Sequence, residues 1–381
     1  MPAILPGATI GILGGGQLGR MTAMAARSMG YHINVLDPDP SCAARFVVDK
    51  CYTRAFDDPD AAAALASECA VVTIEIEKVA IASMRAAGAR CPVRPSASVL
   101  GIVQDRSAQK RWLSAHGFPV GPYRDAASAD QLAQATSALG GTEWYVKAAT
   151  GGYDGRGQFH LKAASQSSEA WHALGESRCV VEAGLDIEYE LSVLVARSPS
   201  GRAAVYAPAL NHHENRILAW SVLPAPIPKA ITARAQQITL GIAEAIAVEG
   251  LLVVEMFRLR DGRLLVNELA PRPHNTYHAS ELACLTSQFE QAVRAICDLP
   301  LGSPDVVRPA AIVNLLGDLW LEAHPPGFDR ALALADVRLH LYGKRVARAG
   351  RKMGHLSATG ATPEAAVKLV HAAYARLVSP R

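Results

Sequence analysis

The chain has 381 residues, of which 50% are apolar, so it carries enough hydrophobic material for about two to four domains. Charged residues make up only 19%, the net charge is +3, and the basic residues are scattered without interleaved aromatics, which gives no support for nucleic acid as a partner. The seven cysteines form no C-x-x-C pair and no uninterrupted apolar run could span a bilayer, so we expect a cytoplasmic protein with no membrane partner.

The N-terminal segment alternates strand-like and helix-like stretches. An apolar strand at residues 8–16 runs into glycines, a helix follows at 17–29, and a second strand at 32–36 precedes an aspartate. Gly14, Gly16 and Gly19 match G-x-G-x-x-G with an acid about 20 residues on, a pattern typical of dinucleotide-binding folds. Such a loop could hold any phosphate at the helix N-terminus, or be a tight turn without a ligand.

Two more strand–helix units are expected at residues 47–67 and 70–88. The second strand leads into Glu75-Ile76-Glu77, which would lie at the carboxyl edge of a parallel sheet, where ligands of such sheets bind. A solvated acidic strand end is an equally good interpretation. Near residue 92, prolines and a new helix indicate the entry to a second domain.

A glycine-rich loop follows a strand expected at residues 141–148. Residues 150–158 (TGGYDGRGQ) contain four glycines, which permit close backbone approach and therefore suit a flap over phosphates. Lys147, on the strand before the flap, would supply a point charge for those phosphates. The alternatives are a flexible surface loop and an ordinary edge lysine. Residues 180–185, an apolar strand with Glu182 and a turn, indicate a hinge between lobes where adenine could contact backbone edges.

Two polar features precede the centre of the chain. A strand at residues 189–196 carries Glu190. Residues 211–215 (NHHEN) are polar enough for metal ligation, but they include no cysteine and no helical histidine spacing. We therefore expect a loop there, with one histidine near a nucleotide.

Residues 251–257 and 264–270 are rich in Leu and Val and predict two strands joined by a tight turn at Asp261-Gly262. Outward pairing from that turn sets three pairs opposite each other: Arg260 and Arg263, Phe257 and Val266, Glu255 and Glu268.

Two carboxylates about 5 Å apart on a mostly apolar hairpin repel each other, and a shared divalent cation would relieve that repulsion. Oxygen ligands favour Mg²⁺ or Mn²⁺, often together with nucleotide phosphates. The alternative is a solvated hairpin with both glutamates on a wet face. By strict alternation Asn267 points away from Glu268, so it joins the same site only if the strand bends.

The core of the protein is expected to end near residue 300. A tail follows, with strands at 310–316 and 337–342, a basic run at 348–355 and a helix at 363–377. A basic run is usually a solvated face, but one bounded by glycines could reach into a phosphate-bearing site.

A strand lysine, glycine flap, acidic hinge and twin-glutamate hairpin, in that order, resemble the ATP-grasp superfamily. Four stretches are more specific: residues 14–21 (GGGQLGRM), 150–158, 267–275 (NELAPRPHN) and 350–355 (GRKMGH). Together they resemble the 5-(carboxyamino)imidazole ribonucleotide synthase family of purine biosynthesis, over essentially the whole chain.

The resemblance implies an α/β protein with the ATP-grasp fold. Its parts would be a Rossmann-like N-terminal domain (1–104), a small lobe with the glycine flap (105–184), a large lobe with the metal site (185–303) and a small C-terminal domain (304–381). It also implies a homodimeric ligase that couples ATP, bicarbonate and aminoimidazole ribonucleotide to give the N-carboxylated product, ADP and phosphate.

The resemblance further implies three sets of site residues. The ATP-binding residues would be Arg106, Lys147, Gly152, Tyr153, Asp154, Gly155, Arg156, Gly157, Gln158, Glu182, Ala183, Gly184, Leu185, Glu190, His213, Asn267 and Glu268. The metal, Mg²⁺ with Mn²⁺ as a substitute, would be held by Glu255, Glu268 and Asn267. The substrate would contact Gly15, Gly16, Gln17, Leu18, Glu75, Tyr153, Arg156, Arg351 and Lys352.

Four residues are candidates for catalysis. Arg272 offers a bidentate fork for carboxyphosphate, and His274 could orient bicarbonate or carry a proton. Asp154 could orient the exocyclic amine of the nucleotide, and Lys352 could close over the intermediate. Gly15, Gly16 and Arg351 are candidates for the ribose phosphate.

One departure from the family pattern concerns the segment after His274-Asn275, where the family usually continues S-G-H and this chain has Thr276-Tyr277-His278. The missing glycine predicts a different local backbone. Three other functions are weighed: an NAD-dependent oxidoreductase built on the glycine loop, a non-catalytic ATP-grasp binding protein, and a bicarbonate-activating ligase with another acceptor. The first leaves the flap and the hairpin unexplained, and only the motif match argues against the last.

Overall fold

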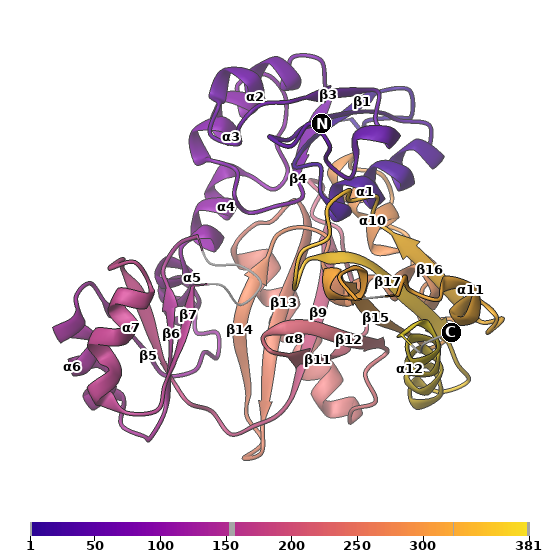
Figure 1. Ribbon diagram of the computed structural model, residues 1–381. Helices are drawn as coiled ribbons and strands as arrows, with labels where there is room; N and C mark the ends of the chain where they lie inside the picture. The colour runs from indigo at the N-terminus through magenta and orange to yellow at the C-terminus, as the bar shows by residue number, and fades with distance from the viewer. Residues whose placement is uncertain (1, 152–156, 323, 379–381) are drawn as a thin grey trace.

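The computed structural model describes residues 2–151, 157–322 and 324–378. The N-terminal part is a parallel sheet in the order β3-β2-β1-β4, covered by helices (Figure 1). Its elements are β1 (Thr9–Leu13), α1 (Gln17–Ser28), β2 (His32–Leu36), η1 (Arg45–Val47), β3 (Lys50–Tyr52), α2 (Pro59–Ala66), β4 (Val71–Ile74) and α3 (Ile81–Gly88). The strands β1, β2 and β4 are almost entirely apolar because helices bury both faces of the sheet. The predicted Rossmann-like beginning is therefore confirmed.

The next part of the chain builds a small lobe around an antiparallel sheet in the order β5-β8-β6-β7. Its elements are α4 (Ala97–Gln104), α5 (Arg106–Ala115), β5 (Tyr123–Ala126), α6 (Ala129–Leu139), β6 (Trp144–Ala148), β7 (Gln158–Leu161), η2 (Ala164–Gln166), α7 (Ser167–Ala173) and β8 (Cys179–Ala183). The side chains of Ser96 and Asp105 cap α4 and α5, so one helix ends where the next begins.

The largest sheet has nine strands, eight of them in the order β14-β13-β9-β11-β12-β15-β17-β16, with β10 paired to β9. Its strands are β9 (Ile187–Arg197), β10 (Ala203–Val205), β11 (Ala209–Glu214), β12 (Ile217–Leu223), β13 (Gly250–Leu259), β14 (Leu264–Ala270), β15 (Ala310–Leu316), β16 (Val337–Leu341) and β17 (Lys352–Thr359). Because β12 pairs with β15, the strands of the tail extend the sheet of the large lobe.

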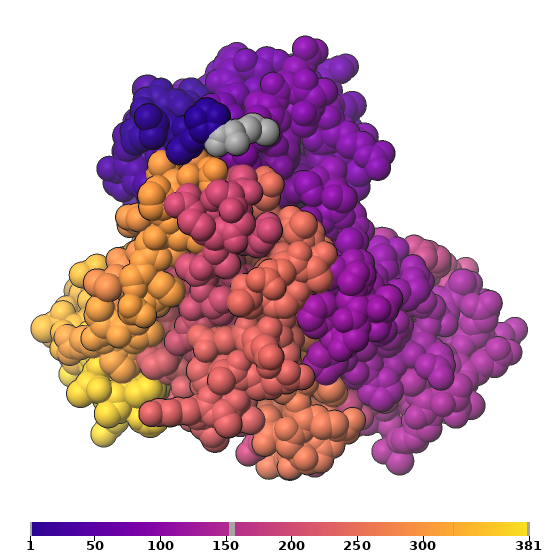
Figure 2. All heavy atoms as spheres, turned by 180° about the vertical axis from the view of Figure 1, so that it is seen from behind, coloured from indigo at the N-terminus to yellow at the C-terminus, as the bar shows by residue number. Residues whose placement is uncertain are grey.

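The helices that pack on this sheet form separate hydrophobic cores with it. The helices and short turns are α8 (Lys229–Ala245), η3 (Asn275–Tyr277), α9 (Ser280–Ala283), α10 (Gln288–Ile296), η4 (Gly317–Trp320), α11 (Phe328–Leu332) and α12 (Pro363–Val378). α5 and α8 pack on β9 and β13, whereas α12 covers β15 and β17. Seen from behind, the N-terminal part caps the large lobe, and the small lobe and the C-terminal segments lie on opposite sides of it (Figure 2).

The hairpin β13–β14 differs from the prediction at its turn. The Leu259 amide donates to the Arg263 carbonyl (2.9 Å), so residues 260–262 form a three-residue loop with Gly262 at φ +97°. The predicted pairings of Arg260 with Arg263 and of Phe257 with Val266 are therefore wrong. A β-bulge restores the register, so Glu255 does lie opposite Glu268 as predicted, and Asn267 is the extra residue of the bulge.

One other prediction about local structure is wrong. Residues 211–214 belong to strand β11 rather than to a loop, with a bulge between His212 and His213. Tyr277, which stands in place of the family's glycine, lies in the regular turn η3 and has no positive φ. Among the described helices, none is both long and apolar enough to cross a bilayer.

Candidate active site

Two buried lysines share one carboxylate at the base of the small lobe. Lys147 Nζ on β6 lies 3.0 Å from Glu182 Oε2, and Lys110 Nζ on α5 lies 3.3 Å from Glu182 Oε1. Burial alone would raise the pKa of Glu182, but the two ammonium groups outweigh it and hold that pKa at about 2. Burial lowers the pKa of Lys110 against the pull of Glu182. The cluster carries one more positive than negative charge, which suits an anionic ligand.

The bulged residue Asn267 connects this cluster to the large lobe. Its Oδ1 accepts a hydrogen bond from Lys147 Nζ (3.4 Å), and its Nδ2 donates to Glu255 Oε2 (3.5 Å). The strand bend that Asn267 needed in order to join the site is therefore present. A small cavity between the lobes is lined by Arg106, Gln109, Lys110, Lys147, Glu182, Asn267 and Glu268.

The paired glutamates Glu255 and Glu268 fit a divalent cation. Burial, followed by the charge of Glu268, raises the pKa of Glu255, while the nearby His213 acts in the opposite direction. Two carboxylates in a buried place need a cation to be stable in the charged form. Asn267 turns its Nδ2 to Glu255 and its Oδ1 to Lys147, so its oxygen would join the two carboxylates only after the amide rotates; the three would then form an all-oxygen donor set, which suits Mg²⁺ or Mn²⁺.

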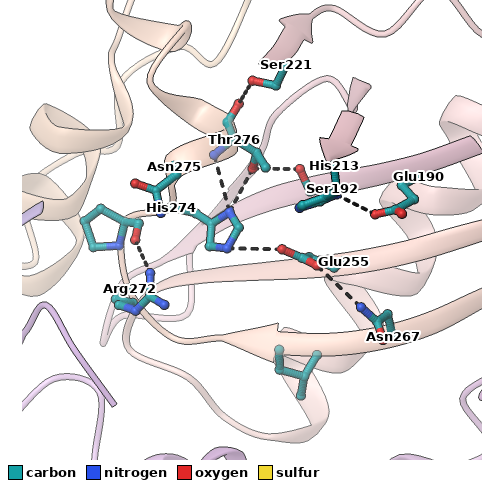
Figure 3. A network of polar contacts seen from close by, with 12 residues as sticks. Glu190, Ser192, His213, Ser221, Glu255, Asn267, Arg272, His274, Asn275 and Thr276 are labelled. Atoms are coloured by element: carbon teal, nitrogen blue, oxygen red, sulfur yellow. Dashed lines mark hydrogen bonds and ion pairs between the residues drawn. The ribbon is translucent and has the colours of Figure 1, made fainter. Parts of the chain in front are cut away.

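A chain of hydrogen bonds fixes Glu255 from behind (Figure 3). Ser192 Oγ donates to Thr276 Oγ1 (2.8 Å), and Thr276 Oγ1 lies 2.9 Å from His274 Nδ1. His274 Nε2 lies 3.2 Å from Glu255 Oε1. Because the Thr276 amide also donates to Nδ1, the imidazole proton belongs on Nε2, facing Glu255.

His274 is neutral in this arrangement. Burial, followed by the charges of Arg272 and Lys352, lowers the pKa of His274 well below its ordinary value. The contacts therefore show His274 orienting a carboxylate of the metal site. Its predicted roles, orienting bicarbonate or carrying a proton, stay predictions, because a neutral ring can still accept and pass on a proton.

Arg272 and Lys352 come from distant parts of the chain, yet both act on His274. Arg272 is partly buried and pairs with Glu77 of the N-terminal part, Nε to Oε1 at 2.7 Å. Lys352 is buried at the start of β17, in the tail. Arg272 and Lys352 therefore both lie near His274, and Arg272 also lies near Glu75 and Glu77 at the end of β4. The N-terminal part, the large lobe and the tail all contribute to this place.

The side chains of Glu190 and His213 form an ion pair close to Glu255. His213 Nδ1 on β11 lies 2.7 Å from Glu190 Oε2 on β9 (Figure 3). Burial would lower the pKa of His213, but Glu190 and Glu255 outweigh it and raise that pKa. His213 therefore carries a positive charge more readily than an ordinary histidine.

Three backbone amides around the start of α1 already donate to carboxylates of the protein. The Gly15 amide donates to Asp37 Oδ2 (2.7 Å), and Glu75 accepts from the amides of Gly16 (2.9 Å) and Gly19 (3.0 Å). A Cβ on Gly14, which has φ +109°, would lie 2.5 Å from Glu75 Cγ. The G-x-G-x-x-G pattern is thus explained by the close approach of Glu75 to the helix N-terminus. This geometry counts against phosphate binding by Gly15 and Gly16 and against a dinucleotide there.

The other predicted residues take varied positions. Gln17 Nε2 reaches Asn275 Oδ1 (3.4 Å) of the catalytic segment, whereas Leu18 packs with Phe289 and Tyr342 in an apolar cluster and does not point into the site. Arg351 Nη1 donates to the Val346 carbonyl (2.7 Å). The predictions for Gly152, Tyr153, Asp154, Gly155 and Arg156 fall outside the described residues.

The remaining predicted contacts lie around the hinge and the end of the flap. Ala183 and Gly184 use their amides to bind the carbonyls of Pro122 and Glu143. Leu185 follows them, and its side chain lies 3.3 Å from the Cβ position of Gly121. Gly157 accepts from the Ala148 amide (2.8 Å), the Gln158 carbonyl accepts from Arg216 (3.1 Å), and Arg106 Nη1 donates to the Ala148 carbonyl (2.9 Å).

Sequence reasoning missed Lys110 and the residues behind Glu255. Lys110 shares a face of α5 with Ser107 and Leu113, which are both buried. A lysine on a buried helix face signals a charged partner, so this pattern could have revealed it. Ser192 and Thr276 carry no such signal, because their partners lie on other elements.

Comparison with models of protein families gives the general class of this protein. An ATP-grasp domain model matches residues 111–289, preceded by a ribonucleotide synthetase preATP-grasp domain at 7–104 and followed by a phosphoribosylaminoimidazole carboxylase C-terminal domain at 310–368. The two lobes that surround the lysine cluster and the glutamate pair therefore belong to an ATP-grasp domain.

Comparison over the whole chain identifies a narrower family than the domain models do. The N5-carboxyaminoimidazole ribonucleotide synthase of Bacillus subtilis is 39% identical over 354 residues, which cover 93% of this chain and 92% of the relative. The solved ADP complex of an N5-carboxyaminoimidazole ribonucleotide synthetase has a TM-score of 0.92 at 39% identity and covers 98% of this chain and 97% of its own. The enzyme of Aspergillus clavatus, solved with ADP and 5-aminoimidazole ribonucleotide, has a TM-score of 0.89 at 30% identity, covering 97% and 98%. This chain belongs to the N5-carboxyaminoimidazole ribonucleotide synthase family.

Proposed function

We propose that this protein is a ligase that uses ATP and bicarbonate to carboxylate the exocyclic amine of 5-aminoimidazole ribonucleotide, a step of purine biosynthesis. Family membership supports the reaction, as does the nucleotide present in the Aspergillus clavatus complex. The observation that carries the proposal is the joint placement of Lys147, Asn267 and the Glu255–Glu268 pair between two lobes.

The triphosphate would lie between the lysine cluster and the glutamate pair. Lys147 and Lys110 exceed the charge of Glu182 by one, so they attract phosphate oxygens. Glu255, Glu268 and Asn267 would hold Mg²⁺, which supplies charge neutralisation to the phosphates when bound. His274 keeps Glu255 oriented for that role through its Nε2 proton.

The chemistry requires that several anions be gathered in one place. A bicarbonate oxygen attacks the γ-phosphorus and ADP leaves, which gives carboxyphosphate; its C–O bond then breaks to release CO₂ and phosphate. The amine nitrogen attacks CO₂ and loses one proton to give the carbamate. Arg272 would bind the carboxyphosphate, because its fork matches two oxygens and Glu77 holds its Nε. Lys352 would neutralise the intermediate from the opposite side.

The first experiment measures ADP release together with carboxylated product. ADP and product should form in equal amounts when ATP, bicarbonate and aminoimidazole ribonucleotide are all present, and little product should form when any one is omitted. ADP release that is independent of the nucleotide acceptor, with no carbamate formed, would contradict the assigned acceptor. Another amine acceptor giving faster carbamate formation would do the same.

A homodimer in the cytoplasm is part of the same proposal and is supported by the family resemblance. Light scattering after gel filtration should give twice the chain mass of 40.4 kDa at micromolar concentration. A mass equal to one chain would contradict the dimer without affecting the reaction.

A further inference from the structure

A second cluster of titratable groups lies where α9 meets the strands of the tail. His340 on β16 and His355 on β17 are directly opposite in the antiparallel register, and their ring centroids lie 4.6 Å apart. His278 stacks on the other face of His355 at 4.5 Å. Glu281 on α9 completes the group, with Oε2 lying 3.9 Å from His340 Nδ1.

Three polar atoms of this cluster are buried without a hydrogen-bond partner among the described residues. They are His278 Nδ1, His355 Nε2 and Glu281 Oε2. His355 is 0% exposed, so its ring nitrogen does not face bulk water. Buried polar atoms without a partner destabilise a fold, so a ligand that satisfies them would be favoured. Burial also raises the pKa of Glu281 to about 7, against the lowering effect of Arg338.

We propose that Glu281, His340 and His355 form a binding site for a divalent transition-metal ion of the Zn²⁺ type. One ligand atom from each residue lies within 4.8 Å of the other two. Two imidazoles and one carboxylate are a donor set that zinc uses, with water as the fourth ligand. The mixed nitrogen and oxygen donors separate this site from the all-oxygen site at Glu255 and Glu268.

The surroundings are already arranged for a metal on His355. Tyr342 Oη lies 2.8 Å from His355 Nδ1, so Nδ1–H can donate to Oη while Nε2 binds the ion. A metal must lie in the plane of each ring it binds, and the two rings are now only 7° from parallel. His340 is the ring that turns, because its side chain is 30% exposed whereas His355 is enclosed.

A metal here would join two segments that carry catalytic residues. α9 follows closely after the segment with Arg272 and His274, and β17 begins at Lys352. An ion between Glu281 and His355 would therefore hold the tail against the large lobe. Its role would be structural, since none of its ligands contacts the predicted nucleotide site.

The test uses the full-length protein, stripped with a chelator and then titrated with Zn²⁺ alone or with Co²⁺ as a spectroscopic probe. Saturating MgADP in every sample keeps the nucleotide site occupied. One equivalent of Zn²⁺ should remain after gel filtration, Co²⁺ should give visible d–d absorption, and the melting temperature should rise. The variants are Glu281→Gln, His340→Ala and Tyr342→Phe, with His172→Ala as the matched control because His172 forms an exposed ion pair with Glu176.

We expect Glu281→Gln and His340→Ala to lose the bound equivalent and the absorption, while His172→Ala keeps both. Tyr342→Phe should weaken Zn²⁺ by about 10–100-fold, the usual effect of removing an outer partner of a ligand. His340→Ala removes a partly exposed ring and should fold, which circular dichroism checks. Failure of the wild type to retain Zn²⁺, or retention of Zn²⁺ by folded His340→Ala, would overturn the proposal.

Discussion

Glu268 lies opposite Glu255 on the hairpin and is one of the two carboxylates that we propose hold the metal. Glu268→Gln removes a charge but little volume, so the protein should fold normally and turnover should be abolished. Turnover measured at saturating Mg²⁺, with thermal unfolding as the control for folding, checks this. Normal turnover in the folded variant would show that the pair holds no essential metal.

Tyr277, which stands where the family usually has glycine, places its hydroxyl among backbone groups of the core. Its Oη accepts from the Leu194 amide (3.1 Å) and contacts the carbonyl oxygens of Ser192 (3.0 Å) and Ala207 (2.8 Å), all in the core. Tyr277→Phe should lower the free energy of unfolding by about 1–3 kcal/mol, because buried backbone groups lose their partner. Chemical denaturation measures this, and an unchanged midpoint would contradict it.

At the residue scale, the sequence predicted the groups with strong local signals. Lys147, Glu182 and the Glu255–Glu268 pair were identified from strand and turn patterns, and the structure brings them together. It did not predict that Glu75 would occupy the N-terminus of α1, because a carboxylate and a phosphate satisfy the same amides. Asn267 could join the metal site only if the strand bulged, and the alternation of side chains along a strand does not reveal a bulge.

Glu75 links two elements, since it lies just beyond β4 and caps α1. Burial is the largest effect on its pKa, followed by the lowering influence of the Gly19 and Gly16 amides and of Arg272, and the pKa is raised from 4.5 to about 7. A carboxyl group with a raised pKa contributes stability below its ordinary pKa and loses it as the pH rises through the folded pKa.

The unfolding free energy of the ligand-free wild type, minus that of Glu75→Gln, should therefore fall as the pH rises from 4.5 to 7. The slope can be at most about 1.4 kcal/mol per pH unit, because one proton is involved. Denaturant titrations at several pH values measure it, with the exposed Glu176→Gln as control. A difference that rises with pH would show that Glu75 is stabilised in its charged form.

Most elements were predictable because their apolar patterns are local. The strands β2 and β15 have the predicted bounds. β11 was mistaken for a loop because it lines a polar site: Glu214, Asn211 and the histidines break the apolar pattern that predicts strands. Edge pairing between β12 and β15 has no local signal, so the continuous nine-stranded sheet was not foreseen.

At the scale of the whole molecule, the tail supplies Lys352 to a site built by the other parts. If Lys352 serves the intermediate more than ATP cleavage, Lys352→Ala should cost the carboxylation step about 2–4 kcal/mol, the scale of one preorganised charge contact. Arg272→Ala should reduce ADP formation as well, because Arg272 would contact carboxyphosphate as it forms. A paired assay of ADP and product gives both values. An unchanged ratio of product to ADP in Lys352→Ala would show that this division of roles is wrong.

The central claim is that bicarbonate, rather than water or the amine, attacks the γ-phosphate of ATP. The most direct measurement uses ¹⁸O-labelled bicarbonate in the complete reaction with aminoimidazole ribonucleotide, followed by mass analysis of the phosphate released. Attack by bicarbonate leaves one of its oxygens on phosphorus when carboxyphosphate breaks down, so each phosphate formed should carry one ¹⁸O. Phosphate without ¹⁸O, formed together with carboxylated product, would contradict the account.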